Sequence, residues 1–177
     1  TKDKSNLGAN AILAVSLATA NAAAKALEIP LYRFIGGVSA TTLPVPMLNL
    51  ENAGAHSSAP VDIQEFLVMP VGAENFSEAL RWGTEVFHSL QKLIKDEGMS
   101  TAVGDEGGFA PEFKSQEDAL DHLVKAIQNA GFEPGKDFVI AIDAASSEWK
   151  SDKGIGFYHQ PKSGKDFTSD ELIEYWE

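Results

Sequence analysis

Residues 104–111 read Gly-Asp-Glu-Gly-Gly-Phe-Ala-Pro, and this acidic, glycine-rich stretch decides how the rest of the chain is interpreted. Glycine adopts positive φ without strain and lets a ligand approach the backbone closely, so such a loop can aim a carboxylate at a bound molecule. Partial burial of either carboxylate would raise its pKa toward the range of a general acid or base. Composition alone favours the simpler interpretation, a solvated acidic turn.

The bulk composition is that of a soluble globular protein. The 177 residues are 44% hydrophobic, and no apolar run reaches the about 20 residues needed to cross a bilayer. The absence of cysteine excludes disulfides and cysteine-ligated zinc and is consistent with the cytoplasm. The net charge of −12 argues against a nucleic-acid partner. It does not argue against a small anionic substrate, because bound metal ions can reverse the local field.

The apolar pattern predicts two parts. The first contains a helix over residues 9–27, capped by Ser5 or Asn6 and ended by the Ile29-Pro30 pair. A polar link at residues 39–42 marks a domain boundary, because the pattern changes after it. The second part is predicted to contain strands at 43–50 and 63–71, a helix at 75–95 capped by Asn75, a helix from Ser115 to Gly131, and an apolar strand at 138–142.

The two ends of the sequence indicate a fragment. The chain begins at Thr1 rather than at methionine. Thr168 and Glu171 fit a capping box for a helix that is still in progress at Glu177. We therefore expect an interior piece of a longer protein.

The apolar strand at 138–142 stops at Asp143. A continuous apolar strand is expected where both faces are covered, as in parallel α/β sheets, and barrel enzymes place their chemistry at the C-terminal ends of such strands. A carboxylate there needs a cation, hydrogen-bond donors or water. Asp143 is either a Mg²⁺ ligand, since that ion prefers hard oxygen donors, or the first residue of a turn over 144–147. The sequence favours neither.

Another group of polar residues surrounds the loop between the first two predicted strands. His56 lies among small residues in this loop, and Gln64 and Glu65 stand at the entry of the second strand. The pKa of histidine lies near neutrality, so His56 is suited to meet a ligand. Gln64 and Glu65 would face opposite sides of a regular strand. Taken alone, a loop histidine beside ordinary strand-edge residues is the favoured interpretation.

Taken together, these segments resemble enolase, the phosphopyruvate hydratase of glycolysis, over essentially the whole chain. The segments that carry the resemblance are Ser5-Asn6-Leu7-Gly8-Ala9-Asn10-Ala11-Ile12-Leu13, Pro30-Leu31-Tyr32, Leu43-Pro44-Val45-Pro46-Met47, Gln64-Glu65-Phe66, Met69-Pro70-Val71-Gly72-Ala73, residues 104–111 and Asp143-Ala144-Ala145-Ser146-Ser147-Glu148. The resemblance implies an α/β fold in two domains. Residues 1–42 would be the helical tail of an α+β N-terminal domain. Residues 43–177 would be the first, incomplete part of a catalytic (β/α) barrel that opens ββαα.

The resemblance also implies a reaction. Enolases are Mg²⁺-dependent carbon–oxygen lyases that interconvert 2-phosphoglycerate and phosphoenolpyruvate. Glu106 would be the acid that helps the hydroxyl leave, and Glu65 would support it by hydrogen bonding. His56 and Gln64 would line the substrate site together with Glu65. Asp143 would be one magnesium ligand, since the charged intermediate of this chemistry needs divalent cations.

Further properties of the whole protein follow from the resemblance. The catalytic lysines and two more metal-binding carboxylates would lie beyond Glu177, so we expect activity in the full-length protein and none in this piece. The full-length protein would be a cytoplasmic dimer or octamer, and the family also allows display at the cell surface. The alternative is an enolase-like scaffold or surface-binding protein without turnover.

Three residues near His56 depart from the family pattern. They are Glu51, where an apolar residue is usual, Ala53, where glycine is usual, and Pro60. If the family glycine needs positive φ, Ala53 adds about 1 kcal/mol of strain.

Overall fold

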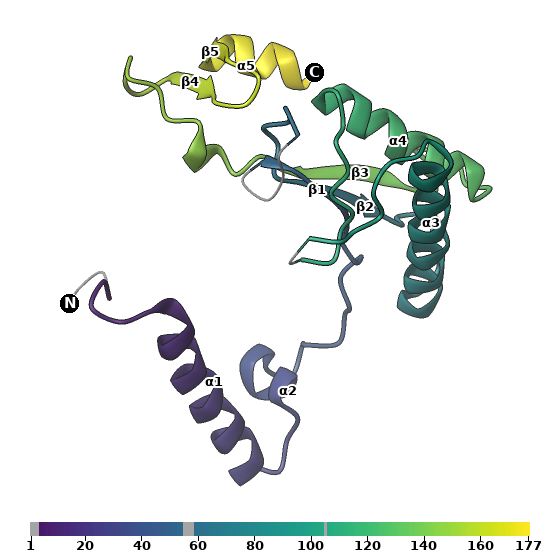
Figure 1. The fold of residues 1–177 in the computed structure, drawn as a ribbon. Helices are drawn as coiled ribbons and strands as arrows, with labels where there is room; N and C mark the ends of the chain where they lie inside the picture. The colour runs from purple at the N-terminus through teal and green to yellow at the C-terminus, as the bar shows by residue number, and fades with distance from the viewer. Residues whose placement is uncertain (1–3, 55–58, 105) are drawn as a thin grey trace. The chain divides into compact units, whose positions relative to one another are not determined.

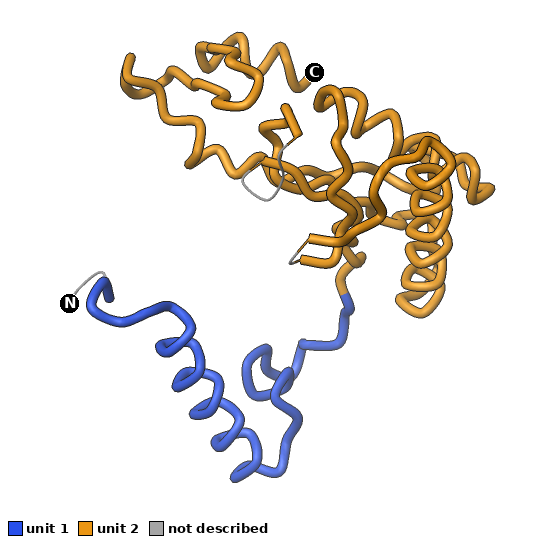
Figure 2. The backbone as a smooth tube through the Cα atoms, in the orientation of Figure 1, with its two compact units in different colours: residues 1–43 blue, residues 44–177 orange. Residues whose placement is uncertain are grey.

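The computed structural model describes residues 4–54, 59–104 and 106–177. The backbone divides into two compact units, Thr1–Leu43 and Pro44–Glu177, which Figure 2 distinguishes by colour. None of the helices in the described ranges is long and apolar enough to cross a membrane.

The first unit contains the helices α1, Ala9–Ala26, and α2, Leu31–Gly36 (Figure 1). α1 begins after Gly8, whose extended backbone leaves the first turn without a side-chain cap. The predicted cap at Ser5 or Asn6 is therefore wrong. The helix begins too late in the chain for either side chain to serve as its N-cap.

The end of α1 lies just before Ile29-Pro30, close to where it was predicted. Glu28 adopts a left-handed φ of 58°, and Ile29 N donates to Ala24 O at 3.1 Å. This pattern closes the last turn of the helix and satisfies one of its free carbonyl groups. Pro30 then forms the N-cap of α2, where a missing N–H is no disadvantage.

The second unit is built around a three-stranded sheet in the order β1-β2-β3 (Figure 1). Its strands are β1, Leu48–Asn52, β2, Glu65–Met69, and β3, Val139–Asp143. Both pairings are antiparallel. The expected parallel pairing of the apolar strand is therefore wrong, because an apolar run indicates burial and carries no information on the direction of its neighbour. Its expected coverage on both faces is also wrong, since β3 is only partly buried.

The first strand is shorter than predicted. The expected strand at 43–50 begins only at Leu48, and Pro44 and Pro46 lie in the extended segment before it. Proline cannot donate to a ladder, so pairing starts after the second proline.

Two long helices cover one face of the sheet. They are α3, Phe76–Asp96, and α4, Gln116–Asn129, and they lie side by side (Figure 1). Both predicted caps are confirmed, because the side chain of Asn75 accepts from Glu78 N and that of Ser115 accepts from Asp118 N. The core between helices and sheet contains the fully buried side chains Phe66, Val68, Val86, Leu90, Ile94, Phe109, Phe113, Leu123 and Ile127.

The last part of the chain forms a hairpin and a helix. The hairpin is β4, Phe157–Gln160, with β5, Lys165–Thr168, and α5, Ser169–Trp176, follows it directly. The predicted capping box of Thr168 and Glu171 is confirmed. The second unit thus opens strand–strand–helix–helix, as expected, and its described residues form an open sheet rather than a closed barrel.

Candidate functional site

Three polar residues form a row across one edge of the sheet. Asn52 at the end of β1 lies opposite Glu65 at the start of β2, and Glu65 lies opposite Asp143 at the end of β3. Directly opposed residues project from the same face of a sheet. The antiparallel topology therefore brings together Glu65 and Asp143, two residues that the sequence analysis had singled out separately.

The acidic loop at 104–111 lies along the other side of β1. Phe109 N donates to Leu50 O and Asn52 N donates to Phe109 O, both at 2.8 Å. The Phe109 ring is fully buried and stacks on Phe87 with the ring centroids 4.5 Å apart. These contacts fasten the loop to the strand that ends in Asn52.

Inside the loop the backbone closes on itself. Gly104 N donates to Gly108 O at 2.8 Å, and Gly107 N donates to Gly104 O at 3.0 Å. Gly107 has a φ of 88°, a conformation that favours glycine. The side chain of Glu106 is exposed but turned to the sheet edge, where it meets Glu65.

The two carboxyl groups of Glu65 and Glu106 interact directly. A hydrogen bond between them is the main reason why the pKa of Glu65 rises to about 7. Partial burial and the nearby charges of Glu106 and Asp143 raise this pKa further, and a hydrogen bond with the Gln64 side chain opposes the rise. Glu65 can therefore hold a proton near neutral pH and donate it in the hydrogen bond to Glu106, a behaviour expected of paired carboxyl groups.

Gln64 lies beside Glu65 rather than on the opposite face. β2 begins at Glu65, so Gln64 precedes the regular strand and its side chain is free of the strand alternation. Its backbone N–H donates to Asp143 O at 3.0 Å, which holds the entry of β2 against the end of β3.

Asp143 begins a turn, which is one of the two roles that the sequence predicts for it. Its Oδ1 accepts a hydrogen bond from Ala145 N at 2.9 Å, and Ala145 adopts a left-handed φ of 48°. The carboxylate is exposed, so a turn and a metal ligand are compatible roles for it. Among the residues that the structure describes, no group of three or more acidic or histidine side chains is arranged to hold a metal ion. The described part of this edge therefore includes Asp143 as a possible Mg²⁺ ligand but not a set of three.

His56 lies outside the described residues, but both sides of its loop are held in place. Ala53 N donates to Gln64 O at 2.9 Å and Gly54 N donates to Val61 O at 3.0 Å. The positive φ in this segment falls on Gly54, at 55°, and not on Ala53. The condition for strain at Ala53 is therefore not met.

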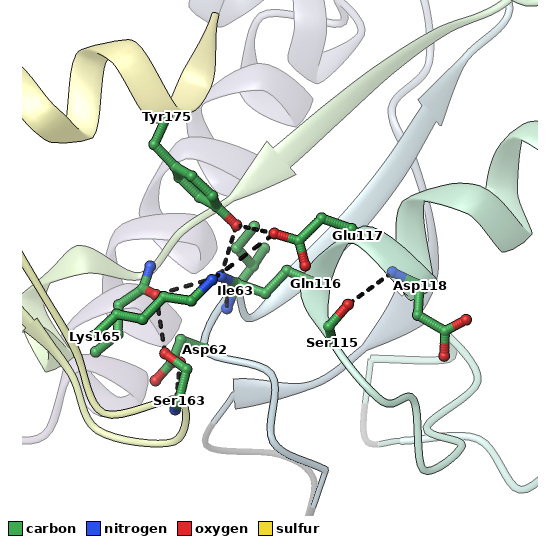
Figure 3. Close-up of polar contacts among 10 residues, drawn as sticks. Asp62, Ile63, Ser115, Gln116, Glu117, Asp118, Ser163, Lys165 and Tyr175 are labelled. Carbon is green, nitrogen blue, oxygen red and sulfur yellow. Dashed lines mark hydrogen bonds and ion pairs between the residues drawn. The ribbon is translucent and has the colours of Figure 1, made fainter.

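A buried polar network holds the entry of β2 (Figure 3). The amide of Gln116 at the start of α4 is buried, and its Oε1 accepts from Ile63 N at 3.1 Å. Its Nε2 donates to Tyr175 on α5 at 3.0 Å and to Gln160 on β4 at 3.3 Å. Burial, with a hydrogen bond to Glu117, raises the pKa of the Tyr175 hydroxyl, so it stays protonated. The network connects α4, the hairpin and α5 to the backbone just before Gln64 and Glu65.

Two asparagines at the site were missed by the sequence analysis. Asn49 Nδ2 donates to Asn52 Oδ1 at 2.7 Å and, over a longer 3.4 Å, to Glu106 Oε2. Residues three apart face opposite sides of a regular strand, so their spacing does not suggest a pair. A bulge between Asn49 and Glu51 shifts the register and turns both side chains to one face.

Glu51 is a carboxylate in the wrong environment for a charge. Its side chain is fully buried, and neither carboxylate oxygen has a hydrogen-bond partner among the described residues. Burial, and to a lesser extent the charge of Asp118, raises the pKa of Glu51 well above its usual value. The departure from the family pattern at this position therefore places an unpaired carboxyl group in the core, where the charged form is disfavoured.

An α/β unit whose sheet edge pairs two carboxyl groups around a shared proton is typical of an enzyme site built for acid–base chemistry. Comparison with known families names the class. A family model described as "Enolase, C-terminal TIM barrel domain" matches residues 40–177, and one described as "Enolase, N-terminal domain" matches residues 1–35. The chain belongs to the enolase family.

Proposed function

We propose that the protein carrying this chain catalyses the reversible, Mg²⁺-dependent dehydration of 2-phosphoglycerate to phosphoenolpyruvate. The observation that supports this proposal is the hydrogen bond between Glu65 and Glu106 beside Asp143, which raises the pKa of Glu65 to about 7. The reaction needs an acid near neutral pH at the point where a hydroxyl leaves, and an isolated exposed glutamate is ionised there.

Each residue of the site has a role in this proposal. After a base removes the proton next to the substrate carboxylate, Glu106 passes the proton that Glu65 holds in their mutual hydrogen bond to the departing hydroxyl, which leaves as water. Glu65 thus stores the proton and Glu106 delivers it. In the reverse direction Glu106 takes a proton from water. Gln64 and His56 would line the substrate site.

Asp143 would supply one carboxylate oxygen to Mg²⁺, which stabilises the negative charge of the substrate when bound. The remaining ligands and the catalytic lysines are expected beyond Glu177. We further propose that residues 1–42 belong to the N-terminal domain of the family and residues 43–177 to the start of its barrel. The assembled enzyme would be a cytoplasmic homo-oligomer acting on a small phosphorylated anion.

The test is turnover of 2-phosphoglycerate with Mg²⁺ by the protein expressed from the complete reading frame, followed by the ultraviolet absorbance of the enol product. Glu106→Gln is expected to lower kcat by about 10²- to 10⁴-fold, the range of general acid catalysis. Glu133→Gln, an exposed glutamate in the loop after α4, is the matched control and should leave kcat unchanged.

Two outcomes would contradict the proposal. If Glu106→Gln kept the wild-type kcat, Glu106 would not be the acid of the reaction. A protein that binds Mg²⁺ and 2-phosphoglycerate without turning the substrate over would instead be an enolase-like scaffold. The 177-residue chain by itself is expected to show no turnover, and measurable dehydration by it would contradict the assignment of the proton-removing groups beyond Glu177.

A further inference from the structure

The loop that carries Glu106 is attached to β1 through two side-chain amides, which we call the asparagine pair: Asn49 and Asn52. Asn52 Nδ2 donates to the buried carbonyl of Gly108 at 3.2 Å, and Asn52 Oδ1 accepts from Asn49 Nδ2 at 2.7 Å. Asn49 Nδ2 then reaches Glu106 Oε2 at 3.4 Å. The pair thus spans the distance from the loop backbone to the acid itself.

The hydrogen bonds run in one direction only. Gly108 O is an acceptor, so Asn52 must turn its NH₂ group toward it and its oxygen toward Asn49. Asn49 must in turn present its NH₂ group to that oxygen. A reversed amide at either position would set two acceptors against each other. The group that Asn49 offers to Glu106 is therefore always a donor, which can hold the acceptor oxygen of Glu106 in place.

The glycines of the loop fit closely against the pair. A Cβ at Gly104 would lie 2.9 Å from Asn52 Nδ2. A Cβ at Gly108 would lie 2.9 Å from Asn49 Oδ1 and 3.0 Å from Asn52 Nδ2. At Gly108 the Cβ would also lie 3.0 Å from the backbone N of Glu51. Neither glycine has a positive φ, so these two positions need glycine because β1 and its amides pack there and not because of backbone conformation.

The pair also carries a cost in stability. Asn49 Oδ1 is buried and has no hydrogen-bond partner among the described residues. An unpaired buried carbonyl is unfavourable, so the orientation that Asn52 imposes on the Asn49 amide is held at some cost in stability.

We propose that the asparagine pair positions the acid of the reaction, with Asn49 donating to Glu106 and Asn52 fixing the direction of that bond from Gly108. The proposal rests on the proposed function for its catalytic consequence and on the contacts above for its structural part. Asn49 acts through Glu106 and is a positioning residue, not a catalytic one.

The kinetic test uses the complete enzyme with Mg²⁺ and 2-phosphoglycerate. Asn49→Ala is expected to lower kcat by about 10- to 100-fold, with KM changed by no more than about threefold, because the lost hydrogen bond would hold and stabilise Glu106 as it gives up its proton, and no bond to the substrate is lost. Asn49→Asp should lower kcat at least as much at neutral pH. Its activity should recover partly as the pH falls, since the carboxyl group introduced by this substitution can donate again once it is protonated, whereas Asn49→Ala should not recover.

The matched control is Asn75→Asp. It adds the same charge at a helix N-cap, where aspartate serves as well as asparagine, and should leave kcat and its pH profile unchanged. Wild-type kcat in Asn49→Ala, or equal pH profiles for the Asn49→Asp and Asn49→Ala variants, would overturn the proposal.

A second measurement does not depend on turnover. In the NMR spectrum of the ¹⁵N-asparagine-labelled enzyme, Glu106→Gln should shift the side-chain NH₂ signals of Asn49, and Glu133→Gln should not. An unshifted Asn49 signal would overturn the proposed role of the asparagine pair whether or not the protein turns over 2-phosphoglycerate. If wild-type protein shows no turnover, the proposed function fails and this spectrum still decides the pair. The spectrum also tests the pair when the Asn49 variants fold poorly, because it requires only the Glu106→Gln variant.

Discussion

Glu65 at the start of β2 lies directly opposite Asp143 at the end of β3, and this pairing places the proton-holding glutamate beside the carboxylate proposed to bind metal. The relationship depends on the antiparallel direction of β2. In a parallel neighbour the start of one strand would lie next to the start of the other, and the two residues would be at opposite ends of the sheet.

The raised pKa of Glu65 should depend on Glu106. Glu106→Gln removes the like charge and replaces the shared proton with an amide that donates to Glu65. We therefore expect the pKa of Glu65 to fall from about 7 toward the ordinary glutamate value. ¹³C NMR titration of the glutamate carboxyl carbons would measure it, with Glu133→Gln as the control. A pKa that stays near 7 in Glu106→Gln would show that burial is the dominant cause.

The buried carboxyl of Glu51 should make stability dependent on pH. The pKa of Glu51 in the folded protein lies above its unfolded value of about 4.3. The contribution of this raised pKa to the free energy of unfolding is therefore fully present below the unfolded pKa and is lost as pH rises through the folded pKa. Glu51→Leu should raise the free energy of unfolding at pH 7 by about 1–3 kcal/mol, since no unpaired polar group is left in the core.

Urea unfolding at a series of pH values checks this prediction. The gain of Glu51→Leu over wild type should be constant below about pH 4, where only the unpaired carboxyl group is removed, and should grow as pH rises above it. Glu174→Leu, at an exposed position on α5, is the control and should show no such trend. A gain that does not change with pH would contradict the raised pKa of Glu51 in the folded protein.

The network at the entry of β2 should be important for stability. Gln116→Leu leaves Ile63 N without its acceptor and Tyr175 without its donor, and should cost about 1–3 kcal/mol. Gln128→Leu on the exposed face of the same helix should change the free energy of unfolding by no more than about 0.5 kcal/mol. Equal urea midpoints for the two variants would show that the buried amide contributes nothing.

Glycine should have opposite effects at Ala53 and Ala145. Ala145 is in the left-handed region with a φ of 48°, so Ala145→Gly should stabilise by about 1 kcal/mol. Ala53 is buried and has no positive φ, so Ala53→Gly should destabilise by about 0.5–1 kcal/mol through entropy and lost packing. Thermal unfolding of both variants measures the difference, and stabilisation by Ala53→Gly would contradict the backbone conformation found here.

Several local features could be predicted because they depend on neighbours in the sequence. The caps at Asn75, Ser115 and Thr168 follow from side chains that reach a backbone N–H three residues away. The cap of α1 was misplaced because two polar residues near the start offered equally good candidates, and the helix begins later, after Gly8. The late start of β1 was missed although Pro44 and Pro46 already argued against pairing there.

The sequence by itself determined the family, through residues 104–111 and their order relative to Gln64, Glu65 and Asp143, because the types and spacing of residues are sufficient for such a match. Only the tertiary structure decided which of these residues meet. The direction of β2 joined Glu65 to Asp143, and a single bulge in β1 turned Asn49 and Asn52 toward Glu106. Strand direction and register arise from long-range pairing, and no short stretch of sequence encodes them.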